Sequence, residues 1–555
     1  MAGVPVAIAD GWSLKMFASI ASRLPSAQEF PLRRAVTPFV LLLGALGVYA
    51  GLRAALITVA ESTARDCFWL DVVVFAAACL LSGIRYEEMP TIARPLARGI
   101  GGVVLVQVAF DMATLFYGPA WMFAGANRAF FVFGGCLGLA AGIAALRRPS
   151  FLVPLFFHYV AFRHQLNVLS GVEVSETDYL SMLDVGEFAA IGPLFVVLLT
   201  HPRIAQRFPS WLDAAWVRRT ACALIIAWAI GAHLGNYFVS GWTKIRTGAG
   251  DPFFWLLHNP TQTAILIGLE RGDNPLSAWP WLVQLSWDTI SHLFILVNVF
   301  VLGTQILVPL AVLQRRALML FTVLFDLFHV VVYFTLGAAF FFWVAVNVCI
   351  YLTMKRVDDR SITPAMKIVA VVSIFSAHFL FYTSHLGWLD GAKLASPSFV
   401  AETRDGRRVP IPSVYFGIMS YSIAQTIMYV PDGHFPVRIG GNTYNPTDFR
   451  DSQSCGPQIA EHQDTGVGFQ TVVDIVRNTD ATMRRHPFVK RDNLYYIYPH
   501  HMVANPAMFG AFNSLSMDDI VRYHYVVESV CLSLADGHLV RDVHKTTDIP
   551  IDVAH

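Results

Sequence analysis

The stretch ACALIIAWAIGAHLGNYFVSGWTK, residues 221–244, decides the fold class. It carries no Asp, Glu, Lys or Arg before its last residue, and about 20 predominantly apolar residues suffice for a helix to cross a lipid bilayer. The 555-residue chain around it is 55% hydrophobic and only 14% charged, whereas an ordinary soluble domain carries about 25% charged residues. The composition therefore predicts a polytopic membrane protein.

Ten further stretches share this apolar character, so we predict an all-α polytopic bundle of roughly 9–11 transmembrane helices. The predicted spans are 36–60, 67–84, 99–118, 128–146, 151–170, 184–200, 221–243, 281–312, 317–336, 337–354 and 368–385. They form a domain over residues 36–385. Residues 1–35 precede it as a cytoplasmic segment, in which Trp12, Met16 and Phe17 share one face of a short interfacial helix.

Basic residues set the expected orientation. Lys and Arg gather in alternate connecting segments, such as 315–316 and 355–367, and cytoplasmic loops carry this excess. The N-terminus is therefore expected in the cytoplasm, and an odd number of spans places residues 386–555 outside it. In the outer loop 244–280, FFWLLH and TAILIGL are too short to span and are expected to form re-entrant or surface helices, while Trp255 and Trp279, with Trp281 just beyond, are expected in an interfacial aromatic belt.

Residues 386–555 differ in composition, and we predict that they form a small extracytoplasmic α+β domain. FVAETRDGRRVPIP predicts a hairpin around the Asp-Gly pair at 405–406, and GFQTVVDIVRNTDATMRR has helical spacing. SMDDIVRYHYVVES predicts a helix capped by Ser516. Cys455 and Cys531, the only cysteines of this tail, are expected to form a disulfide in an oxidising compartment, the alternative being two unpaired buried thiols.

Ionisable side chains inside the spans carry the functional signal, because burying them in lipid is costly without a partner or a wet cavity. Three pairs share a helical face at spacings of three or four residues. They are His233 with Tyr237, Asp288 with His292, and Asp326 with His329. Each Asp–His pair can be an internal polar contact, a protonatable site or a metal-ligand pair. The Glu-x-x-His repeats of di-metal bundles are missing, so we favour a wet cavity that handles protons and expect no metal.

Lys244 follows directly on the span 221–243 and allows two interpretations. A lysine at a helix end can anchor the helix by extending its ammonium group to the membrane interface. A lysine stripped of water can instead act as a base near neutral pH. An anchor here would stand on the side of the membrane that the charge bias leaves poor in basic residues, which favours the base.

At this lysine the sequence resembles a known family. YFVSGWTKI is similar to the YF-x-[small]-G-x-x-K segment of vitamin K-dependent gamma-carboxylases and of the wider HTTM family of multi-helix membrane proteins. VSETDYLSML (174–183) resembles the family's loop around an aromatic Tyr-Leu step, and FDLFHVVVYFTLGAAFFFW (325–343) resembles its late helix. The similarity extends roughly over residues 62–354. Thr177 or Asp178 stands where the carboxylases have a histidine, and the tail is shorter than theirs.

The resemblance implies an integral membrane enzyme with a cavity open to the outer leaflet. A lipid-soluble quinol of the vitamin K kind would be its cofactor, and Lys244 would be the base that deprotonates it. The six polar residues of the three pairs would line or buffer the cavity. The implied reaction class is that of a carboxylase-like lyase or a quinol-dependent oxidoreductase, with an unknown substrate and with carbon dioxide and oxygen as co-substrates if the family chemistry persists.

Two other functions fit the sequence. The protein can be a non-catalytic membrane anchor or accessory subunit whose outer tail docks a peptide or protein partner, in which case the polar pairs are structural. A transporter is the third possibility, although no internal repeat or pair of broken helices is visible. The net charge of +1 gives no reason to expect binding of nucleic acid.

Overall fold

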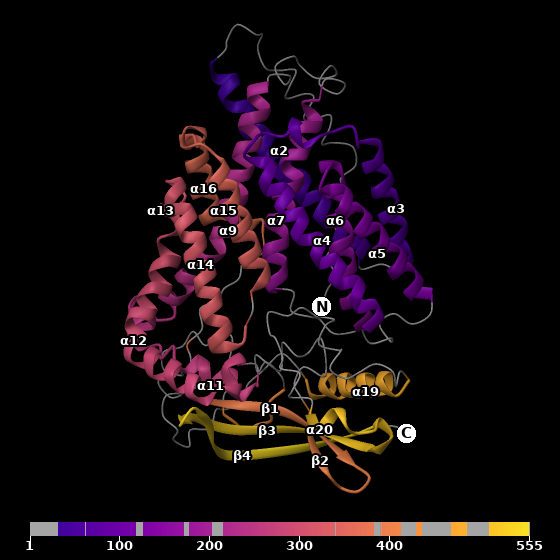
Figure 1. The fold of residues 1–555 in the computed structure, drawn as a ribbon, viewed down its shortest axis with the longest axis vertical. Helices are drawn as coiled ribbons and strands as arrows, with labels where there is room; N and C mark the ends of the chain where they lie inside the picture. Colours follow the sequence, from indigo (N-terminus) through magenta and orange to yellow (C-terminus); the bar gives the residue numbers. More distant parts are fainter. Residues whose placement is uncertain are drawn as a thin grey trace.

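The computed structural model describes residues 31–60, 63–117, 126–170, 177–201, 215–272, 274–338, 340–381, 391–411, 429–435, 468–485 and 510–553, together with Leu389. Figure 1 shows these parts as a helical bundle with a β-sheet across one end. The interfacial helix expected around Trp12 lies outside the described residues.

Among the described residues, eleven helices of 13 or more residues build the bundle, one at each position where the sequence predicts a span. They are α2 (Pro31–Ala60), α3 (Ala64–Leu80), α4 (Ala93–Tyr117), α5 (Ala126–Ala145), α6 (Leu152–Ser170), α7 (Thr177–Leu199), α9 (Ala215–Arg246), α12 (Pro280–Ile306), α14 (Arg315–Leu336), α15 (Phe341–Arg356) and α16 (Pro364–Ser376). Five described stretches are long and apolar enough to cross a membrane, namely Val36–Leu56, Ala93–Phe110, Ala215–Arg246, Pro280–Ile306 and Arg315–Leu336. The helix positions are therefore confirmed, whereas the full set of eleven spans stays a prediction.

Proline and glycine set the helix ends on either side of α14. α12 ends at Ile306 rather than at residue 312, because Pro309 lies in the separate turn α13 (Val308–Ala311) and has no N–H to continue the helix. Gly337 ends α14 in the left-handed conformation, with φ at 79°, which glycine adopts without strain. The predicted boundary between two spans at residues 336–337 is therefore present.

α9 is the most enclosed of the five membrane-length helices. In its most apolar stretch 78% of the residues are buried, against 22% in α12 and in α14. It packs on α2, α7, α12 and α16, and Gly231 lets α16 come close, since a Cβ there would lie 2.4 Å from the carbonyl oxygen of Ala370. Polar side chains on α9 therefore face protein on most sides rather than lipid.

Two glycines of α5 make room for a buried polar pair between α3 and α6. His158 Nδ1 lies 2.8 Å from Asp71 Oδ2, and both side chains are 6% exposed. A Cβ on Gly138 would lie 2.3 Å from His158 Cδ2, and one on Gly134 would lie 3.2 Å from Asp71 Oδ2. The imidazole cannot move away from α5 without breaking its bond to Asp71, so the space beside Gly138 is required.

Gly138→Ala is expected to lower the free energy of unfolding by about 1–3 kcal/mol, the usual cost of overpacking a filled core. Gly47 on α2 provides the control, because a Cβ there meets nothing within 4 Å, and Gly47→Ala should leave stability unchanged or slightly higher. The measurement is the thermal midpoint of each variant purified in detergent. Equal midpoints for the two variants would contradict the packing argument.

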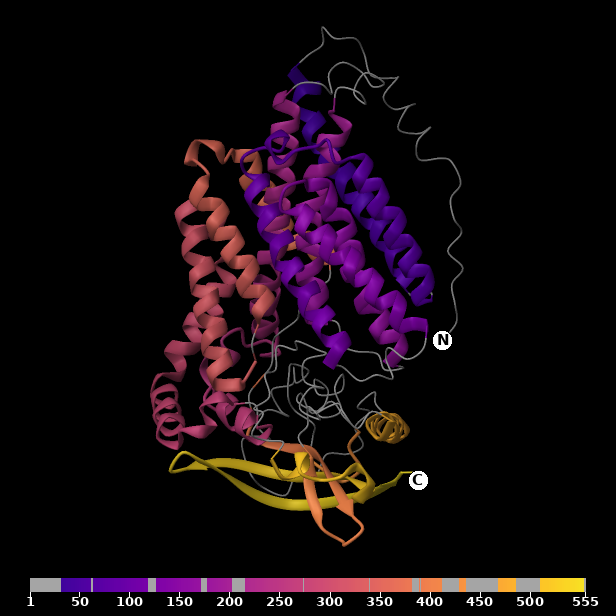
Figure 2. The same ribbon diagram turned by 45° about the vertical axis from the view of Figure 1, so that its right-hand side comes forward.

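The tail forms a four-stranded antiparallel sheet of order β2–β1–β3–β4. The strands are β1 (Lys393–Thr403), β2 (Arg408–Ile411), β3 (Ile520–Ala535) and β4 (His538–Asp552). Helix α19 (Phe469–Arg485) lies on the face of the sheet that is turned toward the bundle, as Figure 2 shows. Val472 and Val476 of this helix belong to the same buried apolar cluster as Tyr523 and Tyr525 of β3. The predicted mixture of helix and strands in the tail is therefore present.

Of the local predictions for the tail, the hairpin and α19 are confirmed and the helix after Ser516 is wrong. β1 and β2 pair Glu402 with Arg408 around Gly406, whose φ is 79°. Ser516 does cap a helical turn, but the turn ends at Asp519 and the chain continues as β3. The segment is rich in Val and Tyr, which favour strands, and pairing on both sides with β1 and β4 outweighs the local helix signal.

The sheet is fastened to the bundle through α11 (Thr263–Glu270), one of the two short apolar helices predicted in the loop 244–280; the other is α10 (Phe254–His258). Arg541 of β4 donates to both carboxylate oxygens of Glu270 at 2.9 Å. Glu270 is only 6% exposed at its side chain. The backbone N–H of Gly537 also donates to Gln284 Oε1 on α12 at 2.8 Å. The β3–β4 hairpin thus contacts two helices of the bundle.

Candidate functional site

One face of α9 presents a line of buried polar side chains, which we call the polar face of α9. His233, Tyr237, Ser240 and Lys244 follow one another at steps of four, three and four residues, so they lie on one side of the helix. Their exposed fractions are 0%, 3%, 3% and 6%. At 1.5 Å per residue the line extends over roughly 16 Å. The predicted sharing of a face by His233 and Tyr237 is therefore present, and the structure adds Ser240 and Lys244 to that face.

Asn347 of α15 joins three of the predicted site residues. Its Oδ1 accepts a hydrogen bond from His233 Nε2 at 2.8 Å, and its Nδ2 donates to Tyr237 OH at 3.0 Å and to Asp326 Oδ1 at 2.8 Å. An amide oxygen cannot donate, so His233 must carry its proton on Nε2. Sequence reasoning missed Asn347, although a fully buried amide inside an apolar helix is a signal of the same kind as the histidines.

Aromatic rings enclose this network. Tyr237 stacks on Phe325 with ring centroids 3.7 Å apart, and the Trp343 ring lies 5.0 Å from Tyr237. His329 lies within 6.0 Å of both Tyr237 and Trp343. Among the described residues, His233 Nδ1, His329 Nδ1 and Trp343 Nε1 are buried without a hydrogen-bond partner. Such atoms are costly to leave unpaired, so the site has spare capacity for a polar ligand.

Lys244 at the far end of the polar face is enclosed by α10. Its Nζ lies 5.4 Å from the centre of the Trp255 ring, close enough for a cation–π interaction. Trp255 is only 3% exposed because its ring covers the lysine, whereas Trp279 and Trp281 are 52% and 67% exposed. The aromatic belt at the interface stays a prediction. Arg246, two residues further on, is exposed. The two basic residues at this helix end therefore have different environments.

The two predicted Asp–His pairs do not form direct carboxylate–imidazole bonds. Asp326 is bound to Asn347 rather than to His329. Asp288 and His292 are exposed on the outer side of α12, where His292 Nδ1 bonds to the backbone oxygen of Asp288 at 2.6 Å. Their expected place in the cavity is therefore wrong, because the face they share is turned away from α9.

The tail contains a second polar cluster, formed by residues of the β-sheet. His524 of β3 lies between Glu402 of β1 and Asp548 of β4, with nitrogen–oxygen distances of 2.7 and 2.6 Å. The hydrogen bond from His524 holds the pKa of Glu402 below its usual value. The cluster ties three strands together. Cys531 of the same strand is disulfide-bonded, while Cys455 lies outside the described residues, so their pairing stays a prediction.

The polar face of α9 has the components of a proton-handling site. It combines ring nitrogens that can accept a proton, a tyrosine hydroxyl and a buried amine at one end. In the part of the chain that the structure describes, no group of three His, Cys, Asp or Glu side chains is placed to hold a metal ion. Comparison with family models, with curated proteins and with solved structures finds no match to this chain.

Proposed function

We propose that the chain is an integral membrane enzyme that performs its chemistry along the polar face of α9, with Lys244 as the base and a lipid-soluble quinol as the cofactor. The substrate class beyond the quinol is open, and the reaction class is that of a carboxylase-like lyase or a quinol-dependent oxidoreductase. The proposal combines the resemblance around Lys244 with the geometry of that residue.

The burial of Lys244 is the observation that carries the proposal. A lysine that anchors a helix end extends its ammonium into water, yet Lys244 is 6% exposed and lies against the Trp255 ring. Arg246, which is exposed beside it, has the environment that an anchor requires. Lys244 has the environment of a functional amine.

The buried polar atoms around the Asn347 network that have no hydrogen-bond partner among the described residues can bind the two oxygens of a quinol. Trp343 Nε1 can donate to a ring oxygen, and His329 Nδ1 can accept from or donate to a second one. A bound quinol would supply an acidic hydroxyl and reducing electrons. The residues of this chain would orient it, exclude water and manage the proton.

In this scheme Lys244 accepts a proton on Nζ and becomes an ammonium group. The face of the Trp255 indole stabilises that charge through its ring quadrupole. Ser240 is the next side chain along the polar face, and Tyr237 OH beyond it accepts a hydrogen bond from Asn347. The hydroxyl groups of these two residues can therefore orient a ligand between the amine and the Asn347 network.

Lys244→Arg is expected to lower the rate at which the purified full-length protein in nanodiscs catalyses oxidation of menadiol by dissolved oxygen by about 100-fold or more, the usual contribution of a general base. Arginine keeps the charge but does not release its proton at physiological pH. Lys244→Ala should behave alike, whereas Arg246→Ala should stay within about twofold of wild type. Trp343→Phe should instead lower the amount of quinone that copurifies with the protein, because the substitution removes the indole N–H that would donate to the quinone.

Thermal midpoints of all variants establish that they are folded. Wild-type turnover by a folded Lys244→Arg protein would show that Lys244 is only an anchor. No quinone in purified wild type and no menadiol oxidation would reject the cofactor as well.

For the orientation, we propose that the sheet lies outside the cytoplasm. The basic segments at 315–316 and 355–367 lie at one end of the bundle, since Arg315, Met354 and Lys367 line one pocket. The sheet lies at the other end, where it contacts α11 (Figure 1). The positive-inside rule assigns the basic end to the cytoplasm, which supports the proposal.

A second candidate function is a non-catalytic one, in which the tail docks a peptide or protein partner. The observation that favours it is β4, which among the described residues pairs only with β3 and is exposed along most of its length. Such an edge can accept an added strand from another chain. Folded Lys244→Arg protein that keeps full biological function would favour this alternative over the enzyme.

A further inference from the structure

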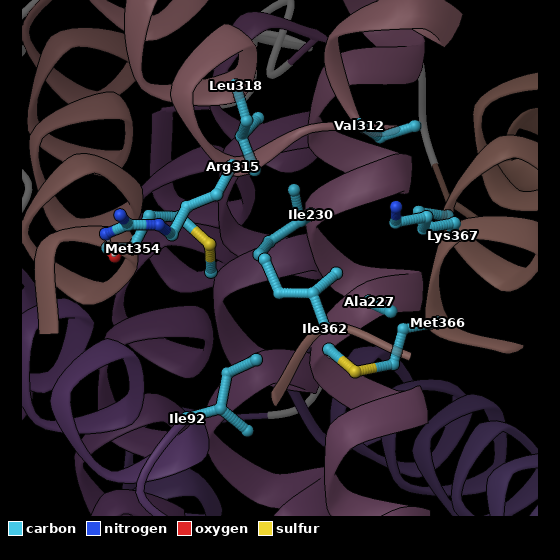
Figure 3. Close-up of a pocket in the computed structure, with 11 residues that line it drawn as sticks. Ile92, Ala227, Ile230, Val312, Arg315, Leu318, Met354, Ile362, Met366 and Lys367 are labelled. Carbon is cyan, nitrogen blue, oxygen red and sulfur yellow. Dashed lines mark hydrogen bonds between the residues drawn. The ribbon is translucent and has the colours of Figure 1, made fainter. Parts of the chain in front are cut away.

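A pocket lies between α9, α14, α15 and α16 at the end of the bundle opposite the sheet (Figure 3). Nine of the eleven residues that line it are apolar, and the other two are Arg315 and Lys367. Its cavity volume is about 30 Å³, so it admits only part of a larger molecule. It is separate from the polar face of α9 that the proposed chemistry uses.

The pocket has an apolar floor and a basic rim. Eight lining residues are buried, among them Ala227, Ile230 and Met354. The three that are half-buried are Ile362, Arg315 and Lys367, so both basic residues stand where the pocket opens. A ligand that enters therefore meets positive charge first and apolar surface behind it.

The two basic residues are not equivalent. Arg315 is already neutralised, because its Nε donates to Asp359 Oδ1 at 2.5 Å and its NH1 to the Met354 carbonyl oxygen at 3.2 Å. The side-chain amine of Lys367 has no hydrogen bond or ion pair to any residue that the structure describes. In Figure 3 its amine points into the pocket from the side opposite Arg315. Lys367 is thus an uncompensated cation beside an apolar floor.

The surrounding segments add to this charge. Residues 315–316 and 355–367 contain six basic and two acidic side chains, a net charge of +4. Lys367 is followed on α16 by Ile368, Val372 and Phe375, which share one face of the helix and are 63%, 48% and 48% exposed. Lipid chains can lie along such a surface in a membrane. The region therefore matches a molecule with an anionic head next to hydrocarbon.

We propose that this pocket binds one anionic phospholipid. Its phosphate contacts Lys367, the first methylenes of one acyl chain rest on the floor formed by Ile230 and Met354, and the rest of the chain lies along the exposed apolar face of α16 that begins at Ile368. A zwitterionic lipid gains less binding free energy at the rim, because its ammonium group is repelled by the net charge of +4. A free phosphate leaves the apolar floor uncovered.

The test is native mass spectrometry of the full chain with phosphatidylglycerol and phosphatidylcholine in equal amounts. Wild type is expected to retain one phosphatidylglycerol in preference. Lys367→Ala should weaken that binding about fivefold, the usual contribution of one basic residue at an anionic membrane surface, and Lys367→Glu should weaken it further. The matched control is Lys355→Ala, which removes an exposed lysine of the same segment outside the pocket. An excess of soluble glycerol phosphate should not displace the lipid.

Several outcomes would overturn the proposal. Equal retention of the two lipids would show that the rim does not select charge. An equal loss in Lys355→Ala and Lys367→Ala would show a diffuse surface effect rather than a site. Displacement by glycerol phosphate would show that the rim binds phosphate alone.

Discussion

Asn347→Leu is expected to lower the free energy of unfolding by about 2–4 kcal/mol and to abolish the proposed activity. The substitution keeps the bulk of the side chain and removes three hydrogen bonds, to His233, Tyr237 and Asp326. Each buried partner left unpaired costs about 1–3 kcal/mol in a water-soluble core. Hydrogen bonds between membrane helices average only about 0.6 kcal/mol. The expected loss of unfolding free energy therefore lies near the lower end of the range obtained by adding the costs of the three unpaired groups.

The control is Thr353→Val on the same helix. Thr353 is as buried as Asn347, at 0% exposure, but its hydroxyl bonds only to the carbonyl oxygen of Cys349 one turn before. Thermal midpoints in detergent should fall clearly for Asn347→Leu and by much less for Thr353→Val. A similar fall in both would mean that the Asn347 bonds contribute nothing specific.

A rescue variant tests the donor–acceptor arrangement itself. Asn347→Asp keeps an acceptor for His233 but turns a carboxylate toward Asp326, so it should be destabilising. Adding Asp326→Asn supplies an amide donor at that position and should restore much of the stability. If the double variant is no more stable than Asn347→Asp, the bond between these two side chains is not what holds α14 to α15.

Arg541→Met is expected to lower the free energy of detaching the sheet from the bundle by about 3 kcal/mol. The change leaves Glu270 buried without its cation, and breaking a buried ion pair costs about 3–5 kcal/mol. The lower figure applies because Arg541 is 36% exposed at its side chain while Glu270 is 6% exposed. Hydrogen exchange of the α11 amides should accelerate by about 100-fold, and a protease should release the tail sooner.

Arg407→Met serves as the matched control for that experiment. Arg407 pairs with Asp405 on an exposed turn, with side-chain exposures of 64% and 57%, so its loss should change little. Unchanged exchange at α11 in Arg541→Met would mean that apolar contacts alone, such as those of Leu266 with Leu394, hold the sheet in place.

The helices were predictable from the sequence, and so was part of the candidate site. Long apolar runs mark helices strongly, and a spacing of four residues correctly put His233 and Tyr237 on one face. The spacing of Asp288 and His292 was equally regular, but periodicity does not say which way a face points. In α12 it points outward.

Contacts between distant segments were not predictable from local patterns. Asn347 forms hydrogen bonds with His233 and Tyr237, which lie 114 and 110 positions earlier in the chain. The sequence near Asn347 contains no pattern that predicts these partners. The same holds for the segment after Ser516, where strand pairing overrides a local cap. Local patterns identify candidates in these cases, and only the packing of helices and strands selects among them.

The ion pair between Glu270 and Arg541 forms late during synthesis of the chain, because its two residues are made at different times. The two residues are 271 positions apart, and a ribosome adds about 5–20 residues per second, so the carboxylate waits roughly 15–50 s for its cation. Ser396, 126 positions after Glu270, can offer a hydroxyl group first, as it does in the finished structure at 2.6 Å. The end of the bundle at α11 is thus closed late in synthesis, after all eleven long helices have been made.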